Sequence, residues 1–345
     1  MLLAKSDLKK IILGENVSIL EVIKNLNSSG LKLVLINSSK NEFQGIINDG
    51  DIRRGFAKGF TIKTKAKLFL KKKPFVIKNA KDLSRIHAKT LNTLVSVPII
   101  KNKKIQGLFV NTTEVKVSKK ILEDVVIMAG GFGRRLGALT KKCPKALLKF
   151  NNKPLLQHII EHLKKNNFLN LRISVFFLKN TIKKFINYNK SFALNINFIQ
   201  ESKPMGTIGS LRLIKSISKD FIVLNCDIVS DINLKNLLSF HKKNKSLLTI
   251  CVKNFQYKNP YGVIKSDKNK FISFKEKPEI NFSINAGIYV FNKKIINIMN
   301  KYKIDQIEEL ILFLQKKKYK ILTYQILENW RDFGSDKKNL KRLIL

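Results

Sequence analysis

Acidic residues are scarce in this sequence of 345 residues. Asp and Glu number 24 against 67 Lys and Arg, which gives a formal net charge of +43. Clustered basic residues would favour a polyanion such as nucleic acid. Only nine of the basic residues are arginines, however, and the lysines are spread from end to end. Because planar nucleic-acid contacts prefer arginine, the charge indicates a compositional bias, and we do not expect a nucleic-acid partner.

Cysteines and long apolar runs are also few. The three cysteines, Cys143, Cys226 and Cys251, are far apart and odd in number, which favours reduced thiols over a disulfide framework. No apolar run approaches the roughly 20 residues that a membrane helix needs. The first ten residues already carry four charged side chains. We therefore expect no membrane segment and no secretory signal, and a cytoplasmic protein.

The length allows one large and one small domain, each with its own core. The first part of the chain holds a weak repeat, in which Phe43–Ile47 aligns with Ile105–Phe109 at an offset of 62 residues. In each copy a helical pattern comes first, followed by an apolar strand (33–36 or 97–100), a turn and a second strand. The repeat predicts two copies of one unit packed face to face.

This unit resembles the cystathionine-beta-synthase-type (CBS) module, above all in residues 45–53. We therefore expect a tandem CBS-domain pair at residues 1–117, with a regulatory or dimerisation role. In that family a turn hydroxyl and an Asp hold an adenosine ribose, so the resemblance implies an adenine nucleotide at Asp51. Asn48 stands where Ser or Thr is usual, and the second copy, at 111–114, has no matching Asp. A folded spacer without a ligand remains the alternative.

Residues 115–122 are a predicted connector, and the chain from residue 123 onward alternates strand and helix patterns. A helix is expected at Pro154–Lys165, where four apolar residues share one face and proline stands near the first position. This alternation is typical of an α/β fold with a doubly wound, mostly parallel, Rossmann-like sheet. The expected strands are 124–128, 173–177, 196–199, 221–225, 247–252 and 286–291.

The most informative segment is a glycine-rich turn directly after the first of these strands. It reads Ala129-Gly130-Gly131-Phe132-Gly133-Arg134-Arg135-Leu136, and Pro144-Lys145 follows. Glycines let backbone N–H groups approach phosphates closely, because they lack Cβ atoms. Leu136 stands where the dinucleotide fingerprint needs glycine, and the Gly-Lys-Ser/Thr of a P-loop is absent. Both common phosphate-loop interpretations therefore fail.

Taken in order, this turn and the segments downstream of it strongly resemble the sugar-1-phosphate nucleotidyltransferase family, in its mannose-1-phosphate guanylyltransferase-like branch. The likeness covers residues 124–335 and implies a nucleotidyltransferase domain at 123–345. It departs from the family pattern where Arg134 replaces Thr, Ala138 replaces Pro and Cys226 replaces Gly. The downstream segments are 201–210, 221–227, 261–263, 274–278, 285–289 and 330–335.

The resemblance implies a Mg²⁺-dependent reaction in which a sugar 1-phosphate oxygen attacks the α-phosphorus of a nucleoside triphosphate and pyrophosphate leaves. Such a reaction needs positioning and charge neutralisation rather than a covalent nucleophile. The resemblance assigns nucleotide binding to Ala129, Gly130, Gly131, Gly133, Glu201, Gly206 and Thr207, catalysis to Arg135, Lys145, Asp227 and Lys277, sugar binding to Tyr261, Gly262, Glu276 and Asn285, and the metal to Asp227 and Asp332.

Glu201 bears on the choice of base. A carboxylate only accepts hydrogen bonds and can take both N1–H and the 2-amino group of guanine, which favours GTP. UTP, CTP and dTTP remain alternatives. With a CBS pair ahead of the domain, the resemblance points to a GDP-mannose- or GDP-glucosamine-type product for surface glycans, and it allows a homo-oligomer.

Two other hypotheses stay open. One is a catalytically inactive, nucleotide-sensing regulatory protein, against which the intact charged residues argue. The other is a zinc site, because His158, Glu161 and His162 match the H-x-x-E-H pattern of inverted zinc peptidases. The same residues lie in an amphipathic helix and no third ligand is evident, so the pattern favours a core helix.

Overall fold

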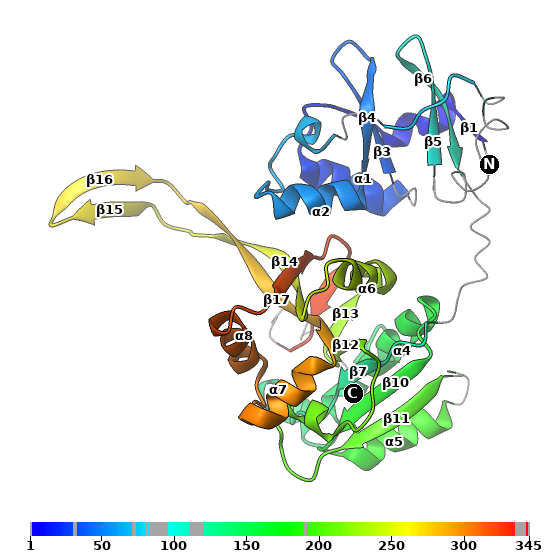
Figure 1. Ribbon diagram of the computed structural model, residues 1–345. Helices are drawn as coiled ribbons and strands as arrows, with labels where there is room; N and C mark the ends of the chain where they lie inside the picture. Colours follow the sequence, from blue (N-terminus) through cyan, green and yellow to red (C-terminus); the bar gives the residue numbers. More distant parts are fainter. Residues whose placement is uncertain are drawn as a thin grey trace. The chain divides into compact units, whose positions relative to one another are not determined.

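The computed structural model describes residues 2–29, 33–70, 74–79, 82, 96–110, 121–189, 192, 194–334 and 343. The chain divides into two compact units, Met1–Lys119 and Lys120–Leu345, each of which is described by itself (Figure 1). In this described part of the chain, none of the helices is long and apolar enough to cross a membrane. Residues 111–114 and Ser335, which belong to predicted motifs, lie outside it.

The first unit contains two three-stranded sheets, in the orders β2-β3-β4 and β1-β6-β5. Helix α2 begins at a capping box, and α1 precedes β3 as the helical pattern predicts. The elements are β1 (Leu2–Ala4), η1 (Lys5–Ile11), β2 (Ile12–Gly14), α1 (Ile19–Ser29), β3 (Leu33–Asn37), β4 (Phe43–Asn48), α2 (Asp49–Ala57), η2 (Ala66–Phe69), β5 (Ser96–Lys101) and β6 (Lys104–Val110).

Each predicted copy of the repeat contains one antiparallel β-hairpin. Ile36 lies opposite Gly45 in the β3–β4 hairpin, and Ile99 lies opposite Gly107 in the β5–β6 hairpin. Both strands that the repeat predicted, 33–36 and 97–100, are present. Leu35 from the first copy and Leu108 from the second are completely buried in one cluster, so the two copies share a core.

The second unit is built on a seven-stranded sheet in the order β11-β10-β7-β12-β17-β14-β18. Neighbouring strands run parallel, except that β17 is antiparallel to both β12 and β14. This is the mostly parallel, Rossmann-like sheet that the alternation predicts. Its strands are β7 (Val125–Met128), β10 (Asn170–Val175), β11 (Asn195–Gln200), β12 (Asp220–Asn225), β14 (Leu248–Lys258), β17 (Glu279–Asn292) and β18 (Ile321–Gln325).

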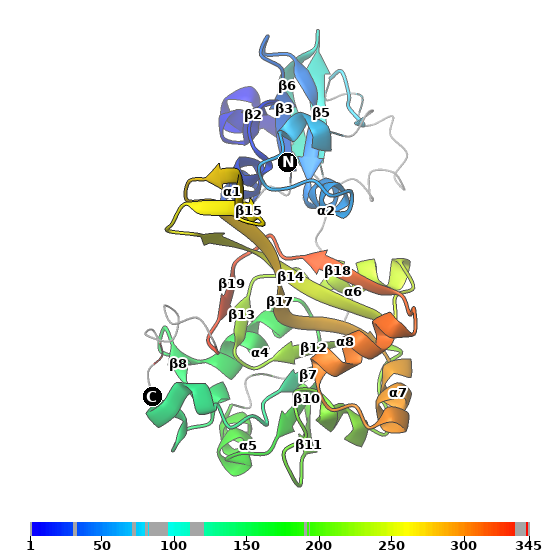
Figure 2. The same cartoon turned by 90° about the vertical axis from the view of Figure 1, so that its left-hand side faces the viewer.

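Helices cover both faces of this sheet (Figures 1 and 2). Val125 and Ile127 of β7 pack with α4, α5 and α6 on one face, whereas Val126 packs with α7 and α8 on the other. The remaining elements are η4 (Arg134–Thr140), η5 (Lys145–Leu147), β8 (Lys149–Phe150), β9 (Lys153–Pro154), α4 (Leu155–Lys165), α5 (Lys179–Tyr188), η7 (Gly209–Leu213), β13 (Ile228–Ser230), α6 (Leu234–Lys243), β15 (Val263–Asp267), β16 (Lys270–Lys275), α7 (Lys294–Tyr302), α8 (Ile307–Lys316) and β19 (Trp330–Asp332).

Strands β14 and β17 are much longer than predicted. Beyond the pair Val252–Asn285 they continue as a two-stranded ribbon to Lys258–Glu279, and the β15–β16 hairpin follows. We call residues 253–284 the arm, which Figure 1 shows projecting from the sheet. The predicted strands 247–252 and 286–291 covered only the continuous apolar runs that are typical of a strand buried on both faces. The prediction stopped at the arm because apolar and polar residues alternate there.

Candidate active site

The glycine turn leaves β7 at the carboxyl edge of the parallel sheet. Gly133, directly before η4, has a φ of +64°, a backbone conformation that few residues other than glycine adopt. The Thr140 hydroxyl closes the turn, lying 3.0 Å from the carbonyl oxygen of Gly133 and 3.3 Å from that of Gly137. Buried Leu136 anchors the far side, while Gly131 remains exposed. The turn is therefore fixed in shape and open at its tip.

Glu201 holds this turn against a second loop. Its side chain is only 5% exposed. Glu201 Oε1 accepts a hydrogen bond from the Ser174 hydroxyl at 2.6 Å, and Oε2 accepts one from the backbone N–H of Met205 at 3.2 Å. A Cβ placed on Gly130 would collide with Oε1. The carboxylate thus ties the loop after β11 to strand β10 and packs against the turn after β7 at Gly130, and both of its oxygens have partners inside the protein.

We expect Gly130→Ala to destabilise this unit, because the new methyl group would displace Glu201 from Ser174 and Met205. The expected loss is about 1–3 kcal/mol in the free energy of unfolding. Gly131→Ala is the matched control, since a Cβ there meets no atom within 4 Å. Denaturant unfolding compares the two variants, and equal stabilities would show that Glu201 does not brace the turn.

The loop after β11 is tied at its other end to helix α8. Gly206 has a φ of +72°, and a Cβ there would lie 2.6 Å from the carbonyl oxygen of Asp305. Thr207 Oγ1 accepts a hydrogen bond from the backbone N–H of Ile307 at 2.8 Å. Gly206 and Thr207 therefore fix the loop that starts at Glu201.

Asp227 and Asp332 are far apart in the sequence and adjacent in the structure. Asp227 follows β12, and the pairing of β13 with β19 sets Ile228 opposite Asp332. The backbone N–H of Phe333 donates to the carbonyl oxygen of Asp227 at 2.9 Å. Phe333 is completely buried, with its ring centroid 4.8 Å from that of Phe150. This packing holds the two carboxylates together at one end of the sheet.

The Lys145 ammonium group and both aspartate carboxylates surround Gly334. A Cβ placed on Gly334 would lie 2.6 Å from Lys145 Nζ and 3.0 Å from Asp332 Oδ1, and it would collide with Asp227 Oδ2. Lys145 and Asp227 also form an ion pair. The chain therefore brings together a flexible cation and two carboxylates that the sequence assigned to one site.

The donor set fits a hard divalent cation. One carboxylate oxygen of Asp227 and one of Asp332 both lie within 3.0 Å of the position that a Cβ on Gly334 would take. Such a pair suits an ion like Mg²⁺, which prefers oxygen ligands and keeps several waters. Among the residues that the structure describes, no group of three or more His, Cys, Asp or Glu is placed to bind a metal. Such an ion would take its remaining ligands from water and phosphate oxygens.

A cavity of about 170 Å³ lies beside the aspartates. The exposed Arg135 contributes a positive charge to the lining of this cavity. Its neighbour Arg134 instead stacks on Phe132, with Cζ 5.2 Å from the ring centroid. The cavity is lined by Arg135, Asn225, Asp227, Ile228, Asn285, Gly287, Tyr289, Trp330 and Asp332. Four of the predicted site residues therefore share one cavity.

Hydrogen bonds fix the polar wall of this cavity. Asn285 donates from Nδ2 to the Tyr289 hydroxyl at 2.8 Å and accepts from the N–H of Gly287 at 3.1 Å. The indole N–H of Trp330 donates to the carbonyl oxygen of Ala286 at 2.9 Å. Burial raises the pKa of Tyr289 to about 12, so its phenol stays neutral. The wall is preorganised and carries no ionised group of its own.

The other predicted sugar-binding residues lie on the arm, together with Lys277. A Cβ on Gly262 would lie 3.1 Å from Glu276 Oε2, so these two segments are neighbours there. Asn285 lines the cavity, and Glu279 lies six residues before it on the extended strand β17, about 20 Å away. The structure therefore does not bring the following arm residues to the cavity of their own chain: Tyr261, Gly262, Glu276 and Lys277.

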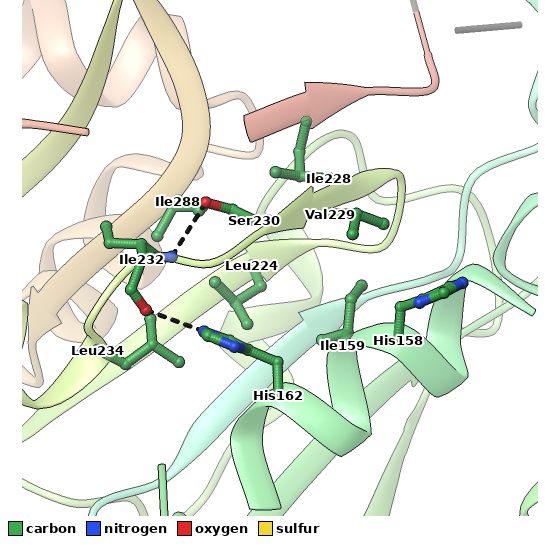
Figure 3. A pocket seen from close by; sticks show the side chains of 10 residues that line it. All are labelled: His158, Ile159, His162, Leu224, Ile228, Val229, Ser230, Ile232, Leu234 and Ile288. Carbon is green, nitrogen blue, oxygen red and sulfur yellow. Dashed lines mark hydrogen bonds between the residues drawn. The ribbon is translucent and has the colours of Figure 1, made fainter. Parts of the chain in front are cut away.

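The two histidines of the H-x-x-E-H match point away from each other, and His162 faces the backbone carbonyl of Ile232 (Figure 3). His158 Nε2 lies 2.8 Å from the carbonyl oxygen of Phe150, and His162 Nε2 lies 2.9 Å from that of Ile232. Burial lowers the pKa of His162 below its ordinary value. Glu161 instead pairs with Lys153. These contacts serve the packing of α4 against the sheet.

The three cysteines are all free thiols, as predicted. Burial raises the pKa of Cys226 to about 12 and also raises that of Cys143. Thiols with raised pKa values stay protonated near neutral pH and are poor nucleophiles. Cys226, although next to Asp227, is therefore a packing residue.

Asp51 in the first unit is engaged within its own helix. The Asp51 backbone N–H donates to Asn48 Oδ1 at 3.0 Å, and Asp51 Oδ2 accepts from the Asn48 N–H at 3.1 Å. Asp51 also pairs with Arg54. Such a capping box stabilises a helix start by itself, so the geometry at Asp51 serves the fold whether or not a ligand binds.

Sequence reasoning did not assign three residues that shape the site, Asn225, Gly287 and Gly334. Each lies inside or next to a segment that the sequence had singled out, so the signal was their position beside Asp227, Asn285 and Asp332. What the sequence could not show is that Gly334 stands against both aspartates.

The chain belongs to the nucleotidyl transferase family, whose match covers residues 124–341. It is 36% identical over 187 residues to a mannose-1-phosphate guanyltransferase of Yarrowia lipolytica, covering 51% of each chain. It is 31% identical over 233 residues to a mannose-1-phosphate guanyltransferase of Saccharomyces cerevisiae, covering 64% of this chain and 63% of the yeast protein. The chain thus spans less than two thirds of the length of these relatives.

Solved structures agree on the fold of the second unit. HddC from Yersinia pseudotuberculosis is 27% identical with a TM-score of 0.50, covering 64% of this chain and 98% of HddC. A putative glucose-1-phosphate thymidylyltransferase from Bacillus anthracis is 19% identical with a TM-score of 0.51, covering 64% of this chain and 93% of that protein. The predicted fold class of the second unit, a Rossmann-like nucleotidyltransferase sheet, is therefore confirmed.

Proposed function

We propose that this chain transfers a guanylyl group from GTP to a sugar 1-phosphate of the mannose type, giving a GDP-sugar and pyrophosphate. The observation that carries the proposal is the meeting of Asp227, Asp332 and Lys145 beside a cavity that Arg135 also lines. The names of the relatives, mannose-1-phosphate guanyltransferases, support the choice of GTP and of the sugar.

Asp227 and Asp332 would hold Mg²⁺, which when bound lowers the negative charge on the α-phosphate and fixes its geometry. Lys145, already in contact with Asp227, stands where it can hold a triphosphate oxygen beside that ion. Arg135, which lines the same cavity as the aspartates, can grip the leaving pyrophosphate with two parallel hydrogen bonds. The proposed catalysis is thus positioning together with charge neutralisation.

The nucleotide would lie along the two loops that Glu201 joins. Backbone N–H groups of the glycine turn would face the phosphates at its exposed tip, Gly131, whereas the Ala129 N–H already donates to the carbonyl oxygen of Ser174 at 3.0 Å. Because both Glu201 oxygens have partners inside the protein, we propose that Glu201 acts on the nucleotide by holding these loops. The preference for guanine then rests on the relatives more than on direct contact with this carboxylate.

Asn285 is the proposed sugar contact within the cavity, since its amide is held in place by Tyr289 and Gly287. Lys277 is the proposed contact to the sugar phosphate, whose repulsion from the nucleotide must be screened. Three further residues of the arm are proposed sugar contacts, namely Tyr261, Gly262 and Glu276.

We further propose that the first unit is a CBS-type pair that binds an adenine nucleotide near Asp51 and regulates the second unit. In each of its two hairpins the glycine of the aligned segment pairs with an isoleucine of the preceding strand, which supports the repeat that this family requires. The proposal fails if adenine nucleotides neither bind to the full chain nor change its turnover.

A substrate panel tests these proposals together. GTP, UTP, CTP, dTTP and ATP are each combined with mannose, glucose and glucosamine 1-phosphates, and pyrophosphate release is followed with Mg²⁺ and with AMP or ATP as effectors. We expect GTP with mannose 1-phosphate to exceed every other pair at least about tenfold in kcat/KM, a difference of about 1.4 kcal/mol. A preference for UTP, CTP or dTTP would refute the guanine assignment. Absence of turnover with every pair would favour a nucleotide sensor.

A further inference from the structure

The arm exposes an unusual share of the large apolar side chains. Of the twenty exposed large hydrophobic residues in the described part of the chain, ten lie between Phe255 and Phe282. Tyr261, Phe271 and Ile264 are the most exposed of these ten, at 75%, 68% and 65%. Large apolar side chains exposed in such number on one segment mark a contact surface.

Four of these side chains lie on one face of the ribbon. Phe255 pairs with Phe282, and Tyr257 pairs with Ile280, across the two strands. Directly paired residues point to the same face, and the one pair between these two, Gln256 with Asn281, is polar. A two-stranded ribbon is marginally stable when isolated, so covering its apolar face would stabilise it.

The arm cannot place Lys277 in the cavity of its own chain without breaking the ribbon. Pairing runs without interruption from Val252–Asn285 to Lys258–Glu279, and Lys277 lies beyond its end. A bend at the joint between ribbon and hairpin would leave Lys277 in place, because Lys277 lies at that joint. Successive side chains of a strand point to opposite faces. The apolar residues 280, 282 and 284 therefore lie on the face of β17 opposite to Asn285, which lines the cavity.

We propose that the arm of one copy of this chain reaches the cavity of a second copy, where Lys277 contacts the sugar phosphate. This inference rests on the proposed function, which requires a cation there. Two copies exchanging arms about a twofold axis would complete both sites and cover both apolar faces.

Charge and size favour a second copy as the occupant. Residues 263–277 carry five lysines and two carboxylates, whereas the cavity presents Asp227 and Asp332 together with the phosphates of its substrates. The arm has 32 residues, comparable to the roughly 20–30 residues that each partner contributes to a stable interface.

Mixed dimers of two defective variants test the exchange. Asp227→Asn and Lys277→Ala chains with different affinity tags are co-expressed, and the dimers that carry both tags are purified in two steps. Each variant alone should lose activity, at least about 100-fold for Asp227→Asn and tenfold for Lys277→Ala. The mixed dimer should recover about half of wild-type activity, because one of its two sites has an intact Asp227 and receives an intact partner arm.

The reciprocal mixed dimer gives the opposite expectation. It pairs wild type with the double variant that carries both Asp227→Asn and Lys277→Ala in one chain. If arms are exchanged it should be nearly inactive, since the intact site receives the defective arm. Half of wild-type activity here, with an inactive first mixture, would mean that each arm serves its own chain and would overturn the inference while leaving the proposed function intact. An inactive wild type would overturn both.

The oligomeric state provides a measurement that does not depend on activity. Sedimentation should show a wild-type dimer at assay concentrations and a monomer for Phe271→Ser. Leu312→Ser is the matched control, because Leu312 is 64% exposed on α8, outside the arm, and it should remain dimeric. A wild type that is monomeric while fully active would overturn arm exchange, as would Lys277→Ala with wild-type turnover.

Discussion

The Asp227→Asn variant is expected to fold normally and to transfer the nucleotidyl group at least about 100-fold more slowly than wild type, because an amide oxygen binds Mg²⁺ far more weakly than a carboxylate. The same substitution removes the negative partner of Lys145, so the lysine is no longer held beside the reacting phosphates. The size of Asn nearly matches that of Asp, and the backbone hydrogen bond from Phe333 to residue 227 remains. Single-turnover rates and thermal unfolding separate the effect on chemistry from any effect on stability.

Asp231→Asn is the matched control for this variant. Asp231 is an exposed carboxylate four residues further along, whose Oδ2 accepts a hydrogen bond from Asn329 at 2.8 Å outside the cavity. It should keep wild-type turnover. Raising the Mg²⁺ concentration should restore part of the activity of Asp227→Asn, because weaker binding is partly offset by mass action. Turnover within threefold of wild type at low Mg²⁺ would remove Asp227 from the metal site.

Much of the second unit could be predicted because the inner strands of its sheet are buried on both faces. Such strands read as continuous apolar runs, and the six predicted runs all coincide with strands of the central sheet. The helix at α4 was predicted within one residue, since its apolar residues repeat at helical spacing and Pro154 precedes it. These elements are determined by local patterns, which is why the sequence alone suffices for them.

The arm and the brace at Glu201 could not be predicted in the same way. Within the described residues the strands of the arm pair only with each other, so its alternating residues carry no signal for where the ribbon leaves the sheet. Glu201 suggested a contact to the base, and the sequence did not indicate that Ser174, 27 residues earlier, would donate to its carboxylate. Both features depend on contacts between distant segments, and local patterns do not encode such contacts.

The candidate site could be predicted from the sequence only in part. The order of short motifs was enough to select Asp227 and Asp332, and the structure places them side by side through β13 and β19. The contribution of Gly334 follows only from the geometry, because the sequence places it two residues after Asp332 without showing what it faces.

Gly334→Ala is therefore expected to abolish most activity without unfolding the protein. The new methyl group would lie 2.6 Å from Lys145 Nζ and 3.0 Å from Asp332 Oδ1, and it would collide with Asp227 Oδ2. Real Cβ contacts are almost never that short, so the charged side chains must move apart. Loss of their positioning should lower kcat/KM at least about 100-fold, as other displaced catalytic groups do.

Two measurements distinguish displacement of the charged groups from general damage to the fold. Gly14→Ala, where a Cβ meets no atom within 4 Å, controls for the substitution itself and should have wild-type activity and stability. In Gly334→Ala both carboxylates are still present, so the concentration of Mg²⁺ that gives half-maximal activity should rise along with the loss of kcat. If kcat/KM fell while this concentration stayed at the wild-type value, the methyl group would be acting on Lys145 alone, and the two aspartates would not share the ion.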